Sequence, residues 1–260
     1  MRREVEHGLH LGRIDRPDST HIVFVHGVMD RGATFLPVTR RLQNESWLVY
    51  DRRGYGRSTC SYVPTFLDHV DDLVAILTAE ADRRPVVVVG HSLGGTLALA
   101  AASRVPESVS AVIVHEAPLP WLDWWPLRDQ EGRKIEDDTP PDAVTRVMER
   151  TAGKVVWEAL SDSVRAKRFS EGPTMVSELV TVRESCPFSP TQLRMPVVVS
   201  RGTGSGGVRE RAQNWLVEML PSAEPRLIDG AAHNVQSTHP EAFAALVIEV
   251  AERVKSVRSS

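Results

Sequence analysis

The sequence predicts an α/β domain in which a mostly parallel sheet is flanked by helices. Short runs of β-branched residues alternate along the chain with longer segments of helical periodicity, which is the pattern of strands joined by crossover helices. The strand-like runs are almost continuous in Val and Ile, as is typical of strands buried on both faces. A length of 260 residues fits one such domain with a substantial core.

Six segments have the composition of buried strands, and three longer segments have the spacing of amphipathic helices. In residues 66–81, Leu67, Val70 and Leu73 fall on one apolar stripe, with acidic side chains in the early turns. Residues 3–14 are expected to form a hairpin through Gly8. The expected strands are 21–25, 47–50, 85–89, 109–114, 196–200 and 225–228, and the expected helices are 66–81, 208–219 and 241–254.

The alternation of strands and helices stops between residues 117 and 194, where helical patterns continue without a strand signal. We interpret this segment as a helical lid inserted into a core domain made of residues 1–116 and 195–260. The lid begins with Trp121, Trp124 and Trp125, which are able to line an apolar substrate pocket. Packing of the lid onto the body is an equally weighted interpretation of these tryptophans.

Composition excludes several classes of partner. The formal net charge is −3 and basic residues are dispersed, so a nucleic-acid partner is not expected. No stretch approaches the roughly 20 apolar residues of a membrane span, and the N-terminus lacks the apolar core of a secretory signal. Cys60 and Cys186 lack metal-ligand spacing. We therefore expect a cytoplasmic monomer or homodimer with a small-molecule partner, no membrane contact, no metal and no cofactor.

Ser92 is the strongest candidate for a catalytic side chain. It lies in the run Gly-His-Ser-Leu-Gly-Gly of residues 90–95, directly between a predicted strand and the alanine-rich helix of residues 96–103. A serine on such a tight strand-to-helix turn is held with its hydroxyl exposed, and glycines on both sides allow strand and helix to approach. The helix N-terminus supplies free N–H groups and a partial positive charge. The context predicts a nucleophile.

A second turn follows the first parallel strand, at His26 and Gly27. The N–H groups of Val28 and Leu93 are then expected to form an oxyanion hole, one from each strand end. His26 is interpreted as a structural histidine of this loop. The expected general base is His233, which follows the last predicted strand and can reach the edge where Ser92 lies, with His239 as the reserve.

These motifs together resemble the α/β-hydrolase superfamily along nearly the whole chain. The matching segments occur in the family's order: His26-Gly27, residues 51–58, residues 90–95 and residues 230–233. The resemblance implies an eight-stranded sheet, a lid after the sixth strand and a triad of serine, acid and histidine.

The triad acid is not at the family's usual place. Most members carry an aspartate in a turn after the seventh strand, but here that turn reads Arg-Gly-Thr-Gly-Ser and ends at Ser205. Glu116, at the end of the sixth strand, delivers a carboxylate to the same sheet edge, and a bacterial subgroup with a His-Glu-Pro-Pro-like turn is similar, although Ala117 replaces its first proline. We predict Glu116 as the acid, with Asp123 and Glu210 as minor alternatives.

The expected activity is hydrolysis of a carboxylic ester or thioester of a small, largely apolar substrate through an acyl-enzyme on Ser92. A serine in this turn argues against dehalogenases and epoxide hydrolases, which the resemblance associates with aspartate there. The alternatives are a cofactor-free haloperoxidase or oxygenase, a carbon–carbon bond hydrolase, and a non-catalytic ligand-binding protein of the same fold.

Overall fold

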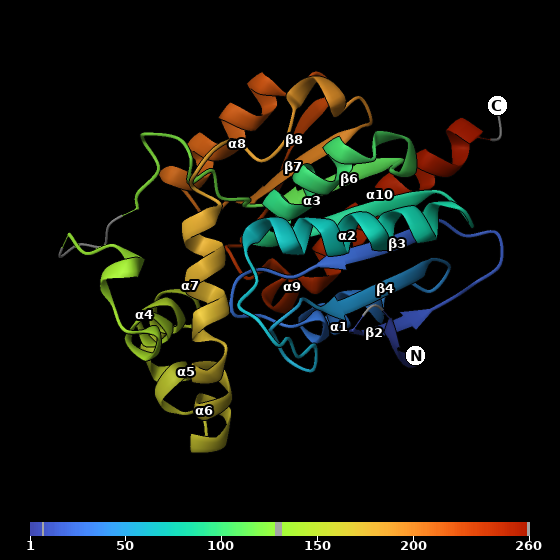
Figure 1. Cartoon of the computed structure of the whole chain (residues 1–260). Helices are drawn as coiled ribbons and strands as arrows, with labels where there is room; N and C mark the ends of the chain where they lie inside the picture. The colour runs from blue at the N-terminus through green and yellow to red at the C-terminus, as the bar shows by residue number, and fades with distance from the viewer. Residues whose placement is uncertain (7, 128–131, 259–260) are drawn as a thin grey trace.

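The computed structural model describes residues 1–6, 8–127 and 132–258. Residue 7 of the expected hairpin and residues 128–131 of the expected lid lie outside this part. The described strands form one sheet of eight in the order β1-β2-β4-β3-β5-β6-β7-β8 (Figure 1). The strands are β1 (Arg2–Glu6), β2 (Leu9–Ile14), β3 (His21–Val25), β4 (Ser46–Asp51), β5 (Val86–His91), β6 (Ala111–His115), β7 (Val197–Gly202) and β8 (Ala223–Ile228).

The sheet is parallel from β4 to β8, while β2 is antiparallel to both of its neighbours. This confirms the predicted α/β class and all six predicted strands, within one to two residues at most ends. In the sheet, β4 lies on one side of β3, and the next strand along the chain, β5, lies on the other side of β3. Such a reversal opens a crevice at the carboxyl ends of the central strands, where ligands bind in open α/β sheets.

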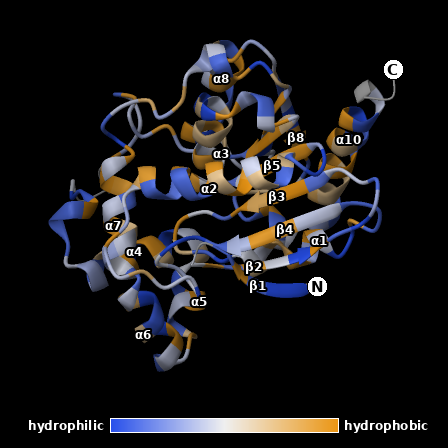
Figure 2. Ribbon diagram, turned by 45° about the vertical axis from the view of Figure 1, so that its right-hand side comes forward, coloured by the Kyte–Doolittle hydropathy of each residue, from blue (hydrophilic) through white to orange (hydrophobic). Residues whose placement is uncertain are grey.

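Helices cover both faces of the sheet. Val86 and Val88 point into one core layer, whereas Val87 and Val89 point into the other, because successive side chains alternate across a strand. The first layer is closed by α2 (Phe66–Ala81), α3 (Leu93–Arg104) and α8 (Val208–Met219), and the second by α1 (Leu36–Thr39), α9 (Val235–Thr238) and α10 (Pro240–Arg258). Figure 2 shows the apolar strands lying inside these more polar helices.

The predicted helix limits are reproduced closely where a local signal exists. The α2 helix begins at the predicted residue because Thr65 and Asp68 form a capping box, in which each side chain accepts a hydrogen bond from the backbone N–H of the other. None of the described helices is long and apolar enough to cross a membrane.

The described part of the segment between β6 and β7 contains four α-helices and no strand: α4 (Pro140–Ala152), α5 (Lys154–Glu158), α6 (Asp162–Ser170) and α7 (Gly172–Thr181). They share a buried cluster that includes Val144, Trp157 and Met175 and that also contains Met29 and Tyr55 of the body. The helices lie together at one end of the sheet (Figure 1). Short 3-10 turns occur at Gly32–Phe35, Pro106–Ser108, Ile135–Asp137 and Pro190–Gln192.

A buried ion network fixes α7 to the body. Glu178 pairs with Arg52, accepts a hydrogen bond from the Tyr55 hydroxyl and lies 3.2 Å from His69 Nε2. Burial by itself would raise the pKa of Glu178, but the Arg52 charge and the His69 contact outweigh it and lower the pKa to about 2. The carboxylate is therefore ionised inside the protein and depends on its partners for stability.

We expect Glu178→Gln to lower the free energy of unfolding by about 3–5 kcal/mol, because it leaves the Arg52 charge buried without its partner. Since the pKa of Glu178 is depressed on folding, the parent holds this stabilisation above pH of about 4.5 and loses it as the pH falls toward 2. Urea unfolding of parent and variant across this range measures both effects. Glu158→Gln, an exposed site on α5, is the matched control and should change the free energy by less than about 0.5 kcal/mol. Equal stability of parent and Glu178→Gln would contradict this role.

Candidate active site

Ser92 stands between β5 and α3 with a backbone that non-glycine residues rarely adopt. Its φ is +54° and its ψ is −129°. The turn is held by the Ser92 N–H, which donates to the His115 carbonyl at 2.9 Å, and by the Ser92 carbonyl, which accepts from the Gly95 N–H at 2.7 Å. A Cβ atom at Gly90 or Gly94 would collide with neighbouring backbone. These two positions require glycine, in agreement with the prediction that glycines around Ser92 allow strand and helix to approach.

The loop after β3 lies directly against this turn. A Cβ atom built on Gly27 would approach the Ser92 Cβ to 3.0 Å, so the two turns are in contact. The N–H of Val28 and the N–H of Leu93 follow these neighbouring strand ends, and neither donates a hydrogen bond within the described residues. Two backbone donors are thus available beside the Ser92 side chain, where the sequence predicted them.

His26 belongs to the structure of this loop. Its ring is fully buried, with Nε2 accepting the Arg52 backbone N–H at 2.9 Å and Nδ1 at 2.8 Å from the Gly27 carbonyl. Burial and the nearby Arg52 charge hold the pKa of His26 well below its usual value. Both ring nitrogens are occupied, which agrees with the structural interpretation.

Glu116 and His233 form the closest pairing of an acid with an imidazole at this edge of the sheet among the described residues. Glu116 Oε2 lies 2.8 Å from His233 Nδ1. Glu116 follows β6 with a φ of +49°, and its backbone N–H donates to the Ser200 carbonyl on β7 at 3.1 Å. Its side chain is completely buried, whereas that of His233 is 18% exposed. The structure thus places the predicted acid against the predicted base.

The turn that lacks an aspartate contributes to the Glu116 site in another way. Ser205 helps to lower the pKa of Glu116, and the Gly202 N–H donates to Oε1 at 3.3 Å. Arg209 Nε lies 2.7 Å from Oε2. Burial would raise the pKa of Glu116, but the hydrogen bonds from His233 and Ser205 outweigh it and bring the pKa to about 2. The carboxylate is therefore ionised at neutral pH.

Two further histidines, His91 and His115, lie behind His233. Their roles were not predicted from the sequence. The ring of His91 is 4.8 Å from that of His233, and its Nε2 lies 2.7 Å from the His233 carbonyl oxygen. His115 Nδ1 is 3.0 Å from the Ser200 hydroxyl. Burial is the main cause that lowers the pKa of both, to about 4 for His115. Both are neutral at neutral pH, so they hold the loop of His233 without adding charge. In the sequence, the position of His91 directly before Ser92 was the signal that could have indicated a role for His91 at this site.

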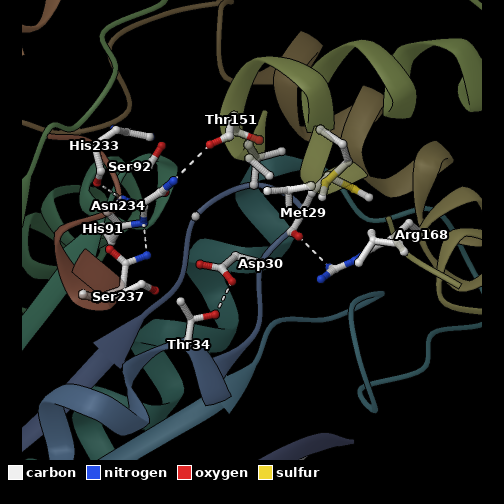
Figure 3. A pocket seen from close by; sticks show the side chains of 17 residues that line it. Met29, Asp30, Thr34, His91, Ser92, Thr151, Arg168, His233, Asn234 and Ser237 are labelled. Carbon is white, nitrogen blue, oxygen red and sulfur yellow. Dashed lines mark hydrogen bonds between the residues drawn. The ribbon is translucent and has the colours of Figure 1, made fainter. Parts of the chain in front are cut away.

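Ser92 and His233 line one cavity of about 250 Å³ (Figure 3). The described hydrogen bonds of these two side chains include the contact of His233 Nδ1 with Glu116 but none between Ser92 and His233, and catalytic hydrogen bonds commonly tighten only in the complex with substrate. Asn234 Nδ2 donates to the Thr151 carbonyl at 3.0 Å and connects the histidine loop to α4. The remaining lining comes from the loop after β3 with its 3-10 turn, the end of β5, the insertion and α9: Gly27, Val28, Met29, Asp30, Thr34, His91, Met148, Ala152, Val156, Leu160, Arg168, Gln236 and Ser237.

The tryptophans proposed for the pocket lie elsewhere. None of Trp121, Trp124 and Trp125 is among the residues that line the cavity of Ser92. All three pack against the core layer beneath α2, α3 and α8. Trp121 meets Phe188 edge-on at 5.6 Å, and the Arg211 guanidinium lies 4.3 Å above the Trp124 ring. Of the two interpretations, the structure supports packing. Met148, Ala152, Val156 and Leu160 supply the insertion's apolar lining instead.

The alternative acids, Asp123 and Glu210, and the reserve base, His239, have other surroundings in the structure. Asp123 is exposed. The Glu210 carboxylate pairs with Arg201 at 3.3 Å. The Nδ1 of His239 contacts the Thr238 hydroxyl at 3.0 Å. The described residues contain no group of three His, Cys, Asp or Glu side chains able to hold a metal ion.

Known proteins share this fold. A model of the alpha/beta hydrolase family matches residues 22–246. The chain therefore belongs to the alpha/beta hydrolase family.

Relatives in this family are distant. The lipase LipV of Mycobacterium tuberculosis is 32% identical over 106 residues, which are 41% of this chain and 40% of that protein. The 2-(acetamidomethylene)succinate hydrolase of Mesorhizobium japonicum is 24% identical over 85% of this chain and 84% of its own length. The structure of MenH from S. aureus superposes with a TM-score of 0.71 at 17% identity, covering 96% of this chain and all of that one (100%). This last similarity supports the fold.

Proposed function

We propose that this protein is a serine hydrolase that cleaves carboxylic esters or thioesters of small, largely apolar substrates. The observation that carries the proposal is the 2.8 Å contact between Glu116 Oε2 and His233 Nδ1, beside the strained turn that presents Ser92 to the same cavity. A buried carboxylate, an imidazole and a serine hydroxyl that lines the cavity are the three groups that acyl transfer requires. The names of the lipase and hydrolase relatives are consistent with this class.

In the first half of the proposed cycle, the Ser92 hydroxyl attacks the carbonyl carbon while the free ring nitrogen of His233 takes its proton. The Glu116 carboxylate fixes the imidazole tautomer and stabilises the imidazolium. The oxyanion accepts hydrogen bonds from the Val28 and Leu93 N–H groups. His233 then returns the proton to the leaving alcohol or thiol, and the acyl group stays on Ser92.

In the second half, His233 removes a proton from a water molecule that attacks the acyl carbon. The tetrahedral oxyanion forms again at the same two donors, and its collapse releases the carboxylic acid as the proton passes to the Ser92 oxygen. We infer that the insertion helices, with Met148 and Leu160 at the cavity, cover the acyl or alcohol group. The covering role of residues 117–194 as a lid is part of this proposal.

The size of the cavity predicts which esters react. A volume of about 250 Å³ with mainly apolar walls accepts short acyl chains. In a series of 4-nitrophenyl esters from acetate to octanoate, with the corresponding aryl thioesters, we expect kcat/KM to peak at the short chains and to fall at least about tenfold by octanoate. The Ser92→Ala protein measures background release. Failure to exceed that background with every ester and thioester would overturn the proposal.

A further inference from the structure

Glu116 has a second cationic partner besides the proposed base. Arg209 Nε lies 2.7 Å from Glu116 Oε2, and His233 Nδ1 lies 2.8 Å from the same oxygen atom. The Glu116 side chain is wholly buried, whereas the Arg209 side chain is 38% exposed. A permanent positive charge therefore stands next to the place where His233 becomes positive during the proposed reaction.

The backbone that carries Arg209 is held in place by the turn after β7. Arg201 donates to the carbonyls of Gly202 and Ser205, and its Nε lies 3.3 Å from Gln213 Oε1 on α8. Gly207, with a φ of +61°, is the N-cap residue that precedes α8, and Arg209 stands in the first turn of that helix. The same turn that offers Ser205 to Glu116 in place of an aspartate thus also delivers Arg209.

We propose that Arg209 is a positioning residue that holds the Glu116 carboxylate toward His233 and whose charge sets the lower pH limit of catalysis. This inference rests on the proposed function of the same site. The guanidinium attracts Oε2 and fixes its direction, but it repels a proton on the His233 ring. Its positive charge therefore opposes the positive charge that forms on His233 when Ser92 attacks.

Other charges near His233 do not change the sign of this effect. Glu116, with a pKa of about 2, is ionised wherever an imidazole titrates. His91 and His115 have pKa values lowered by burial and stay neutral there. From α4, Arg150 adds a second positive charge that interacts with Arg209. On the cavity side, Asp30 and Arg168 line the same cavity as His233. All of these groups are present in both the parent and an Arg209 variant, so a comparison isolates the Arg209 charge.

The test is the pH dependence of Ser92 phosphonylation by a fluorophosphonate, which needs no knowledge of the substrate. The Ser92 oxygen attacks phosphorus, fluoride leaves, and the hydroxyl proton passes to His233, so the rate falls as His233 becomes protonated. In Arg209→Gln we expect the acidic limb of the rate profile to move to higher pH by roughly 0.5–1 unit at low salt, with a smaller shift in high salt. Arg209→Lys should restore most of the parental profile, because it keeps the charge.

Arg211→Gln is the matched control, since Arg211 stands on the same helix but contacts the Trp124 ring instead of Glu116. Its profile should coincide with that of the parent. The nitrogen signals of the His233 ring, followed by NMR against pH, report the same shift without any activity. If the ring signals and the acidic limb of Arg209→Gln coincide with the parent, the role of Arg209 is overturned. If the parent is not phosphonylated at all, the proposed function fails, while the ring signals still decide the effect of Arg209.

Discussion

The Ser92→Ala variant is expected to lose ester-cleaving activity by at least about 10⁴-fold in kcat, because it lacks the oxygen on which the proposed acyl-enzyme forms. The Ser92 side chain lines the same cavity as His233 and stands at the strained φ of +54°. Alanine has the same steric restrictions on φ and ψ as serine and lacks only the hydroxyl oxygen, so the variant should fold. Steady-state turnover of 4-nitrophenyl acetate measures the loss, and thermal unfolding checks that the fold is retained.

Ser103→Ala provides the comparison on the same helix. The Ser103 hydroxyl donates a hydrogen bond to the Ala100 carbonyl of α3, eleven positions along the chain from Ser92. Its activity should equal that of the parent within about twofold. Ester turnover by a folded Ser92→Ala protein at more than about one-hundredth of the parental rate would mean that the acyl group is carried elsewhere.

The Glu116→Gln variant is expected to lose about 10³–10⁴-fold in kcat while keeping its fold. An amide can still accept the proton on His233 Nδ1, but it cannot stabilise the imidazolium that forms when Ser92 attacks, and its amide group also competes for the wrong tautomer. Because Glu116 is ionised with a pKa of about 2, the substitution removes a full negative charge from the site at all working pH values. Turnover of the short-chain ester at pH 7 to 8 gives the loss directly.

Glu210→Gln is the control for Glu116, because Glu210 contacts Arg201 and was the minor alternative for the acid. Its turnover should stay within about threefold of the parent. If Glu210→Gln lost activity and Glu116→Gln did not, the acid assignment would have to change while the nucleophile assignment stood.

The sequence predicted the parts of this molecule that depend on local patterns. The strands came from runs of Val and Ile, and Ser92 from glycines that the structure shows to be sterically required at positions 90 and 94. Glu116 could be placed near His233 because parallel strands end at one edge of the sheet, so a carboxylate after β6 reaches the base that follows β8. These inferences require only the order of the strands and the sheet edge at which they end. They require no detail of side-chain packing.

Features that depend on side-chain direction were not accessible in the same way. The tryptophans carried an apolar composition that fits a pocket or a core equally well, and only their packing against the core layer distinguishes the two. Arg209 looked like one of many surface arginines, because its contact with Glu116 joins residues 93 positions apart in the chain. Its position depends on the turn held by Arg201, for which the sequence has no short-range signal.

The mass of the protein after treatment with a fluorophosphonate reports directly whether Ser92 is the nucleophile. We expect one adduct per chain, located by peptide mapping on Ser92, with no adduct in Ser92→Ala and strongly slowed formation in Glu116→Gln. An unmodified parent protein, or an adduct on a residue other than Ser92, would show that Ser92 is not the nucleophile.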